Sequence, residues 1–258
     1  MITYQAMGAH DWDGATYDRI SAPLERNGLA VLERLPLEGH ETVLDAGCGS
    51  GRVTEKLAGR LPRGRVIGVD GSAGMIEAAR RRLGENVELI LCDLTELDLG
   101  GRRVDAVFSN AVFHWISDHD LLFARLRGVL RDGGRLVAQC GGEGNTAELL
   151  GATLKVGGEE PFAPYLSGFS PWYYAGPDET AARLRAAGFT EIETGLVPRP
   201  VPYEDDVREW LRVNALSAHQ LRLPEDLRHR YVDAVHAELG PDPQISYIRL
   251  EIDAIATA

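Results

Sequence analysis

The sequence predicts an α/β fold, in which a doubly wound parallel sheet carries helices on both faces. Three observations lead to this prediction. Short apolar runs alternate with amphipathic stretches along the first half of the chain, as in β-α-β units. A glycine-rich loop, VLDAGCGSG, ends the first run at residues 43–51. Later runs end on the acids Asp70 and Asp93, and the carboxyl ends of parallel strands meet at one edge of a sheet.

Five strands are expected in the first half of the chain, over residues 41–47, 64–70, 87–93, 104–115 and 135–140. The first helix has an apolar face made of Leu24, Gly28, Val31, Leu32 and Leu35. The second helix has a core stripe made of Val53, Leu57 and Leu61. Two further helices are expected over 72–84, with Ser72 as N-cap and Gly84 as its stop, and over 119–134. Helices of this length between strands require parallel pairing through right-handed crossovers.

The second half of the chain loses this alternation. Residues 141–176 are rich in Gly, Pro and aromatic residues and are expected to form a long irregular segment. Helices are expected over 178–189, with Asp178 as N-cap, and over 224–239, with one face made of Leu227, Tyr231, Val235 and Leu239. Strands are expected over 191–197 and 245–258, and the last one is expected to pair antiparallel at a sheet edge.

The composition is that of one globular enzyme-sized unit. The chain has 258 residues and a formal net charge of −12, with 44% hydrophobic residues. An acidic chain lacks the clustered Lys and Arg that nucleic-acid binding needs, so no nucleic-acid partner is expected. The three cysteines fit neither a disulfide framework nor a zinc pattern, and no apolar run reaches membrane-spanning length. We therefore expect a cytoplasmic protein without metal or membrane contact, as a monomer or homodimer.

The glycine loop distinguishes between nucleotide-binding classes. A P-loop needs Lys and Ser or Thr after its last glycine, but Arg52 and Val53 follow Gly51. Arg52 also stands where the dinucleotide fingerprint has its third glycine, so an NAD-dependent oxidoreductase is a weaker alternative. Asp45 beside the loop would repel a pyrophosphate and favour a cation. With Asp70 suited to a ribose diol and Asp93 to an adenine amino group, the expected ligand has an amine, a ribose and an adenine.

The motifs VLDAGCGSG, VIGVD, LCDL, VDAVFSNAVFHWI and LRDGGRLV, between about residues 40 and 140, resemble those of class I S-adenosylmethionine (SAM) methyltransferases. The resemblance implies a Rossmann-like sheet of seven strands, mostly parallel with the last strand antiparallel, and SAM as cofactor. It places the loop glycines at the methionine portion of SAM, Asp70 at the ribose, Asp93 and Leu94 at the adenine, and Asn110 at the methionine end. The expected SAM-binding residues are Tyr17, Asp45, Gly47, Gly49, Gly51, Asp70, Gly71, Met75, Asp93, Leu94 and Asn110.

Segments outside these motifs resemble the trans-aconitate methyltransferase group. They are WDGATYDRISAP, NAVFHWISDHDLLFARL, LPEDLRHRYVDAV and YIRLEIDAIA. Malonyl-carrier methyltransferases share the middle motif. The resemblance implies a single domain, with a core of about 36–140, 177–199 and 245–258 and a helical cap from 1–35, 141–176 and 200–244. It implies in-line O-methylation of a small carboxylic acid. A phenol, amine or carbon acceptor stays open, as does a SAM-binding protein without transfer activity.

Candidates for the acceptor side are less specific. A carboxylate is ionised at neutral pH and needs no base, whereas a phenol or an ammonium needs one. His114 and Trp115, after the fourth strand, are the weak catalytic candidates, with His119 a further possible base. The substrate-binding candidates are Trp12, Trp115, Trp172, Tyr173, Arg199 and Arg222. Arg212 and Arg249 are additional arginines that could bind a carboxylate, and Cys140 is expected to be a buried spectator.

Overall fold

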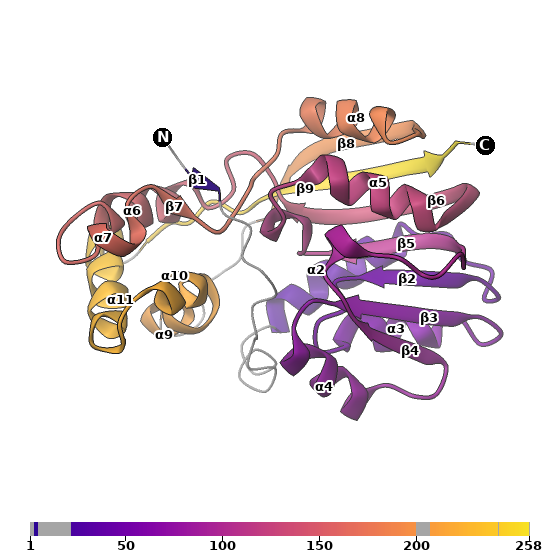
Figure 1. Cartoon of the computed structure of the whole chain (residues 1–258), viewed down its shortest axis with the longest axis horizontal. Helices are drawn as coiled ribbons and strands as arrows, with labels where there is room; N and C mark the ends of the chain where they lie inside the picture. The colour runs from indigo at the N-terminus through magenta and orange to yellow at the C-terminus, as the bar shows by residue number, and fades with distance from the viewer. Residues whose placement is uncertain (1–2, 5–21, 200–206, 242, 258) are drawn as a thin grey trace.

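The central element of the fold is a seven-stranded sheet (Figure 1). The computed structural model describes residues 3–4, 22–199, 207–241 and 243–257. The strands, in their order across the sheet, are β4 (Val87–Leu91), β3 (Arg65–Asp70), β2 (Thr42–Ala46), β5 (Val104–Asn110), β6 (Leu130–Gly141), β9 (Ile248–Ala256) and β8 (Phe189–Pro198). Neighbours from β4 to β6 pair parallel, and β9 pairs antiparallel with both β6 and β8. The predicted Rossmann-like fold class is confirmed.

The last strand corrects one detail of the prediction. We expected it at a sheet edge, but β9 lies between β6 and β8. The reason is burial: Leu250, Ile252 and Ala254 are all completely buried. A strand whose inward side chains are this well covered is stabilised by ladder hydrogen bonds on both sides.

Helices cover both faces of the sheet. On one face, α2 (Ala22–Glu33) and α3 (Arg52–Gly59) pack on the strands through Val31, Leu32 and Leu57. On the other face lie α5 (His119–Val129) and α8 (Pro177–Ala186), and α4 (Ala73–Arg82) borders β3 and β4. The buried side of α2 thus contacts the sheet.

The strand predicted over residues 104–115 is shorter than expected. β5 ends at Asn110, and Ala111 has a φ of +61°, a value that L-residues adopt at turns rather than within strands. A single 3-10 turn, η2 (Phe113–Trp115), follows. The turn moves His114 and Trp115 out of the sheet and over its carboxyl edge.

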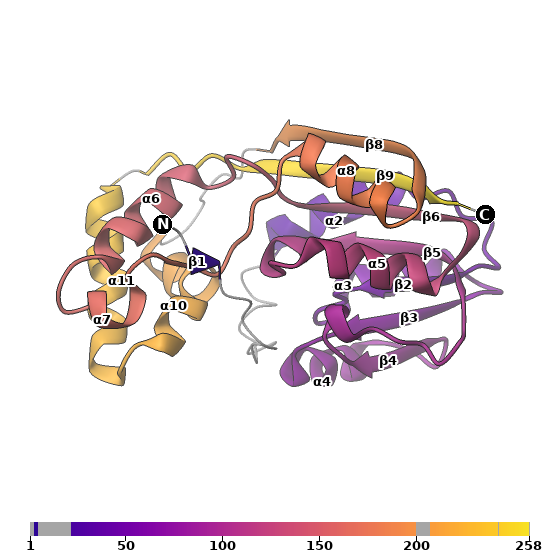
Figure 2. The same cartoon turned by 45° about the horizontal axis from the view of Figure 1, so that its top comes forward.

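A separate lobe of helices lies beyond the carboxyl ends of the parallel strands (Figure 1, Figure 2). It contains α6 (Ala147–Gly157), α7 (Ala163–Leu166), α9 (Val207–Trp210), the π-helix η3 (Leu211–Ala215), α10 (Ser217–Arg222) and α11 (Glu225–Leu239). A short strand, β7 (Phe169–Ser170), pairs parallel with β1 (Thr3–Tyr4). The lobe has its own apolar core. No helix in the described ranges combines the length and the apolar character needed to cross a membrane.

The prediction of an irregular segment over residues 141–176 is wrong, because helix α6 lies within it. Leu149, Ala152 and Val156 are buried on one side of α6, at the spacing of one helical face. The glycines of this stretch obscured that period in the sequence. Gly157, for example, lies where an added Cβ would come within 3.1 Å of Leu166, so it permits close packing instead of breaking the helix.

Three segments form the junction between the lobe and the sheet, and we define it as residues 141–146, 172–175 and 246–249. Backbone hydrogen bonds join them, from Gly142 N to Ile248 O (3.1 Å), from Glu143 N to Ala175 O (3.0 Å) and from Thr146 N to Ser246 O (2.7 Å). The junction therefore has a defined backbone geometry where the lobe meets the carboxyl edge.

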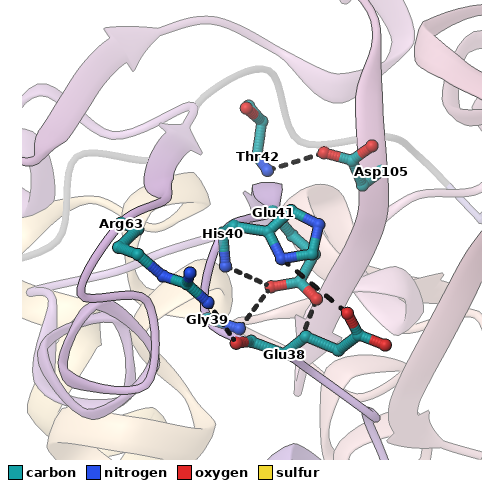
Figure 3. Close-up of polar contacts among 7 residues, drawn as sticks. All are labelled: Glu38, Gly39, His40, Glu41, Thr42, Arg63 and Asp105. Atoms are coloured by element: carbon teal, nitrogen blue, oxygen red, sulfur yellow. Dashed lines mark hydrogen bonds and ion pairs between the residues drawn. The ribbon is translucent and has the colours of Figure 1, made fainter.

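At the amino ends of the parallel strands, the carboxylate of Glu41 holds the turn that precedes β2 (Figure 3). It accepts backbone hydrogen bonds from Glu38 N (2.6 Å), Gly39 N (2.9 Å) and His40 N (3.0 Å). Burial raises the pKa of Glu41, but the backbone donors outweigh it, so the pKa lies below its usual 4.5. Asp105 accepts from Thr42 N at 2.7 Å beside it. These contacts fix the turn from which β2 starts.

Replacing Glu41 by alanine should lower the melting temperature by about 2–4 °C at pH 7, since the loss of charge-assisted hydrogen bonds costs about 1 kcal/mol. The lowered pKa means that this stabilisation is present above about pH 4.5 and is lost as the pH falls through the folded-state pKa. Thermal unfolding at pH 7 and pH 3.5 measures it, with Glu38→Ala as control, because the Glu38 side chain is 84% exposed. An equal loss at both pH values would contradict this account.

Candidate active site at the carboxyl edge of the sheet

The glycine loop follows β2 and is fixed by the end of β3. Gly47 N and Cys48 N both donate to Val69 O, at 2.8 and 3.0 Å. Gly47, Gly49 and Gly51 have φ values of +86°, +55° and +84°, which favour glycine. A Cβ at Gly47 would come within 2.1 Å of the Val112 side chain, whereas a Cβ at Gly49 would meet nothing within 4 Å. Gly47 therefore serves close packing, and Gly49 presents bare backbone to open space.

Asp70 connects this loop to the start of α4. Its carboxylate accepts from Gly49 N and from Ser72 N, each at 2.9 Å. Burial raises its pKa, and the two backbone donors act in the opposite direction. Gly71 follows it directly, and the backbone of buried Met75 donates to the predicted N-cap Ser72 at 3.2 Å. Each carboxylate oxygen retains acceptor capacity, because one lone pair per oxygen is used by the backbone.

Asp45 lies beneath the loop and not at its surface. It is 2% exposed, and its Oδ2 accepts from Thr54 Oγ1 at 2.7 Å. Burial is the largest influence and raises the pKa of Asp45 to about 7, with Thr54 lowering it and Asp70 raising it further. This carboxyl therefore ionises less readily than an exposed aspartate.

The remaining predicted cofactor residues lie at the same edge. Asp93 follows β4 by two residues and caps the 3-10 helix η1 (Leu94–Glu96), accepting from Thr95 N at 2.8 Å. Leu94 is 5% exposed. Asn110 ends β5 and lies against Gly28, where an added Cβ would be 3.0 Å from Asn110 Nδ2. The structure thus brings Asp45, Asp70, Asp93 and Asn110 to the carboxyl ends of four adjacent strands. Tyr17 and Trp12 lie outside the described residues.

His114 lies above the end of β6 and is a poor base. Its Nδ1 accepts from Gly141 N at 3.2 Å, and the residue is 8% exposed. Burial lowers the pKa of His114 to about 3, with smaller contributions from Arg249 and His119. Its ring centre lies 5.3 Å from that of Trp115. Cys140 beside it is buried, and burial raises the pKa of its thiol to about 12.

The aromatic run SPWYYAGP divides between two sides of the chain. Trp172 stacks on Tyr174 with ring centres 6.2 Å apart, and Trp115 lies 6.3 Å from Trp172. Tyr173 points elsewhere: its hydroxyl donates to Glu179 at 2.5 Å, and its ring meets that of His119, 5.0 Å between centres. The structure therefore does not place Tyr173 with the other aromatic candidates.

Two neighbours of Tyr173, His119 and Tyr174, also have defined contacts in the structure. His119 is 1% exposed and its Nε2 lies 2.9 Å from Phe113 O, so it is a buried structural residue. Tyr174, which the sequence groups with Trp172 and Tyr173 as a possible pocket wall, shares a 3.0 Å hydrogen bond with Thr146 Oγ1. Alternate residues of an extended segment point to opposite sides, and this signal separates Trp172 and Tyr174 from Tyr173.

Three of the four candidate arginines have an ion-pair or surface ring partner. They are Arg199 with Glu251 (3.2 Å), Arg212 with Glu209 (2.6 Å) and exposed Arg222, whose Cζ lies 4.4 Å from the ring centre of Phe169. The first two are ion pairs, although Glu251 also pairs with Arg34, and the third is a surface cation–π contact.

Arg249 differs from these three. It is 5% exposed, and its Nε is buried without a hydrogen-bond partner. Its Cζ lies 5.1 Å from the ring centre of Tyr247, and its charge lowers the pKa values of His114 and Tyr174. Across the described ranges, neither an ion pair nor a hydrogen bond engages its guanidinium. Arg249 is thus a buried cation at the carboxyl edge, near His114.

Asparagine at position 45 should stabilise the ligand-free protein, and more so at high pH. The raised pKa means that the wild type carries a buried carboxylate above about pH 7, while the unfolded chain ionises near 3.8. The loss of folding stability that Asp45 causes in the wild type therefore grows between about pH 4 and pH 7. We expect Asp45→Asn to raise the melting temperature by roughly 4–8 °C at pH 8 and by less at pH 5.5. Exposed Asp178→Asn is the control, and a pH-independent difference would contradict the assignment.

Comparisons with known proteins agree with this geometry. The family profile described as "Methyltransferase domain" matches residues 43–134. An uncharacterized methyltransferase of Schizosaccharomyces pombe is 32% identical over 212 residues, 78% of each chain. The trans-aconitate 2-methyltransferase of Variovorax paradoxus is 30% identical over 237 residues, 86% of each chain.

Solved structures share the fold. The phosphoethanolamine N-methyltransferase 2 of Haemonchus contortus, in complex with SAM, superposes with a TM-score of 0.60 at 22% identity over 90% of this chain and 53% of that one. The YcgJ protein of Bacillus subtilis superposes with a TM-score of 0.64 at 17% identity, over 90% and 99% of the two chains. With the sheet order, the glycine loop and relatives at this identity and coverage, the chain belongs to the class I SAM-dependent methyltransferases.

Proposed function

We propose that this methyltransferase transfers the methyl group of SAM to a carboxylate oxygen of a small organic acid. The observation that carries the proposal is Arg249, a buried guanidinium without an acidic partner in the described part of the chain. A buried unpaired charge is costly for a protein, and an anionic ligand would offset that cost. A carboxylate fits a planar two-pronged donor, so this cation supports an acceptor that carries at least one carboxylate group.

The state of His114 supports the same acceptor class. Its Nδ1 is occupied by the Gly141 amide and its pKa is near 3, so it binds protons too weakly to deprotonate an ammonium or a phenol at neutral pH. A carboxylate nucleophile is already ionised and requires no such step. The relatives named trans-aconitate 2-methyltransferase, at 30% identity or more, add independent support for an acid acceptor.

We also propose how the residues around the glycine loop would bind the methyl donor. Bare backbone at Gly49 would admit the methionine portion of SAM, and the remaining lone pairs of Asp70 would accept the two ribose hydroxyls. Asp93 and Leu94 would border the adenine, and Asn110 the methionine end. Asp45, beneath the loop, would favour the positive charges of SAM when ionised. The bound donor supplies an activated methyl group on a sulfonium, and the protein supplies alignment, worth up to about 7–11 kcal/mol.

The acceptor class can be tested directly with methyl-labelled SAM and a panel of small carboxylic acids, phenols and amines. The trans-aconitate named by the relatives belongs in the panel. We expect label only in the acids, released as volatile methanol after mild alkali because the product is an ester. Alkali-stable label in phenols or amines, with none in acids, would refute the carboxylate proposal while leaving the family assignment intact.

The two glycines offer a matched pair for the SAM site. Gly49→Ala places a methyl group in open space. We expect its free energy of unfolding to fall by only about 1 kcal/mol because of the positive φ, but we expect SAM binding to weaken at least about tenfold. Gly47→Ala collides with Val112 and should mainly lower thermal stability. Isothermal titration with SAM and thermal unfolding measure both. Unchanged SAM affinity in Gly49→Ala would show that the ligand does not approach this backbone.

A further inference from the structure

We propose that Arg249 is a specificity-determining residue, which binds a carboxylate of the acceptor other than the one that receives the methyl group. The acceptor would then be at least a dicarboxylic acid, and its product an ester that stays anionic. This inference rests on the proposed function, because it divides the acceptor into a reacting and an anchoring acid group.

The position of Arg249 in the sheet determines which groups surround its guanidinium. Arg249 lies opposite Gly141 in the antiparallel pair of β6 and β9, so the two residues face the same side of the sheet. A Cβ at Gly141 would come within 2.6 Å of the Tyr174 ring. The glycine thus leaves room for Tyr174 beside the arginine, and Tyr247 lies under the guanidinium. The cation is surrounded by rings and backbone.

The nearest acid on the same side of β9 is already neutralised. Glu251 lies two residues along the strand and pairs with Arg34 and Arg199, each at 3.2 Å. It also accepts from Gln139 Nε2 at 3.1 Å. Because two arginines already pair with the single carboxylate of Glu251, this acid does not compensate the charge of Arg249. The surrounding groups His114 and Tyr174 are neutral at pH 7, with pKa values near 3 and 12.

The chemistry of the transfer argues against Arg249 binding the reacting group. An acceptor carboxylate oxygen forms a bond to the methyl carbon as the carbon–sulfur bond breaks, and the bonding pair stays on sulfur. No proton moves, and the oxygen loses its negative charge as the ester forms. An arginine on that oxygen would stabilise the ground state more than the transition state and would slow the reaction. On a second carboxylate, whose charge is unchanged, the same bond positions the acceptor without that penalty.

The spacing of the strands fits an anchor at a distance from the methyl group. Asn110, proposed for the methionine end, lies on β5, and Arg249 lies two strands away on β9. Neighbouring strands are about 4.8 Å apart, so the two backbones are separated by about 10 Å. Allowing for the side chains, a short diacid is long enough to place one carboxylate at each end.

The test uses acceptors that differ only in the second carboxylate, such as fumarate and crotonate, with trans-aconitate as a larger polyacid. For the wild type, we expect kcat/KM to be about 10- to 100-fold higher with fumarate than with crotonate, the usual range for one charge-assisted bond. Arg249→Met should remove this preference by lowering the fumarate value, with the crotonate value unchanged within about twofold. Arg249→Lys should retain part of it, since lysine keeps the charge without the planar fork.

Controls separate binding from folding. Arg102→Met removes an exposed arginine that pairs with Glu88 beside β4, and it should change none of these values. The affinity for S-adenosylhomocysteine should be the same in all variants, and ligand-free Arg249→Met should melt at or above the wild-type temperature because it lacks an unpaired buried cation. An equal loss with fumarate and crotonate, or a wild type without preference, would overturn the anchor.

Failure of the proposed function gives a different result. If the wild type methylates no acid, calorimetric titration of the protein loaded with S-adenosylhomocysteine by fumarate still tests the anion site. Saturable binding that Arg249→Met abolishes would support the anchor without the reaction. No binding to the wild type would overturn it.

Discussion

The hydrogen bonds between the glycine loop and the end of β3 are the interaction on which the site depends. Val69 O accepts from two loop amides, and Asp70 accepts from a third, Gly49 N. These bonds turn the backbone of the loop toward the neighbouring strand and hold it in a conformation that only glycines adopt without strain. Because Asp70 also accepts from Ser72 N, the same carboxylate fixes the loop, the end of β3 and the start of α4.

The carboxyl edge of the sheet carries acidic side chains near the glycine loop and an uncompensated cation on β9. Around the loop, Asp45 is buried and Asp70 is half-buried, and burial is the main cause that raises the pKa values of both. Their carboxylates would suit a cationic methyl donor. Three strands from β2, Arg249 is a buried cation, and the nearest acid on its side of β9, Glu251, is shared by other arginines. A cationic donor and an anionic acceptor would each meet a complementary charge. Glu251 pairs with both Arg34 and Arg199, so it leaves Arg249 uncompensated.

The sequence predicted best what local rules decide. The loop, the strand end at Asp70 and the cap at Ser72 all follow from neighbours in the chain, and the structure places them together. Helix α6 was missed because its glycines hide the period of Leu149, Ala152 and Val156. The position of β9 was missed because strand order depends on burial against α5 and α8, which no local pattern encodes. Tyr173 was grouped with Trp172 because adjacency in sequence says nothing about sides of an extended segment.

By itself, the sequence determined the fold class and the methyl donor, since each rests on residue types at fixed spacing along one stretch of chain. Only the tertiary structure decided which arginine is available to an acceptor. Arg199, Arg212, Arg222 and Arg249 are equivalent as letters in the chain. They differ in which carboxylates and rings the fold brings against them, and that depends on long-range pairing of β6, β8 and β9 around the junction. Charge compensation is a property of three-dimensional neighbours, so it could not be predicted from the sequence.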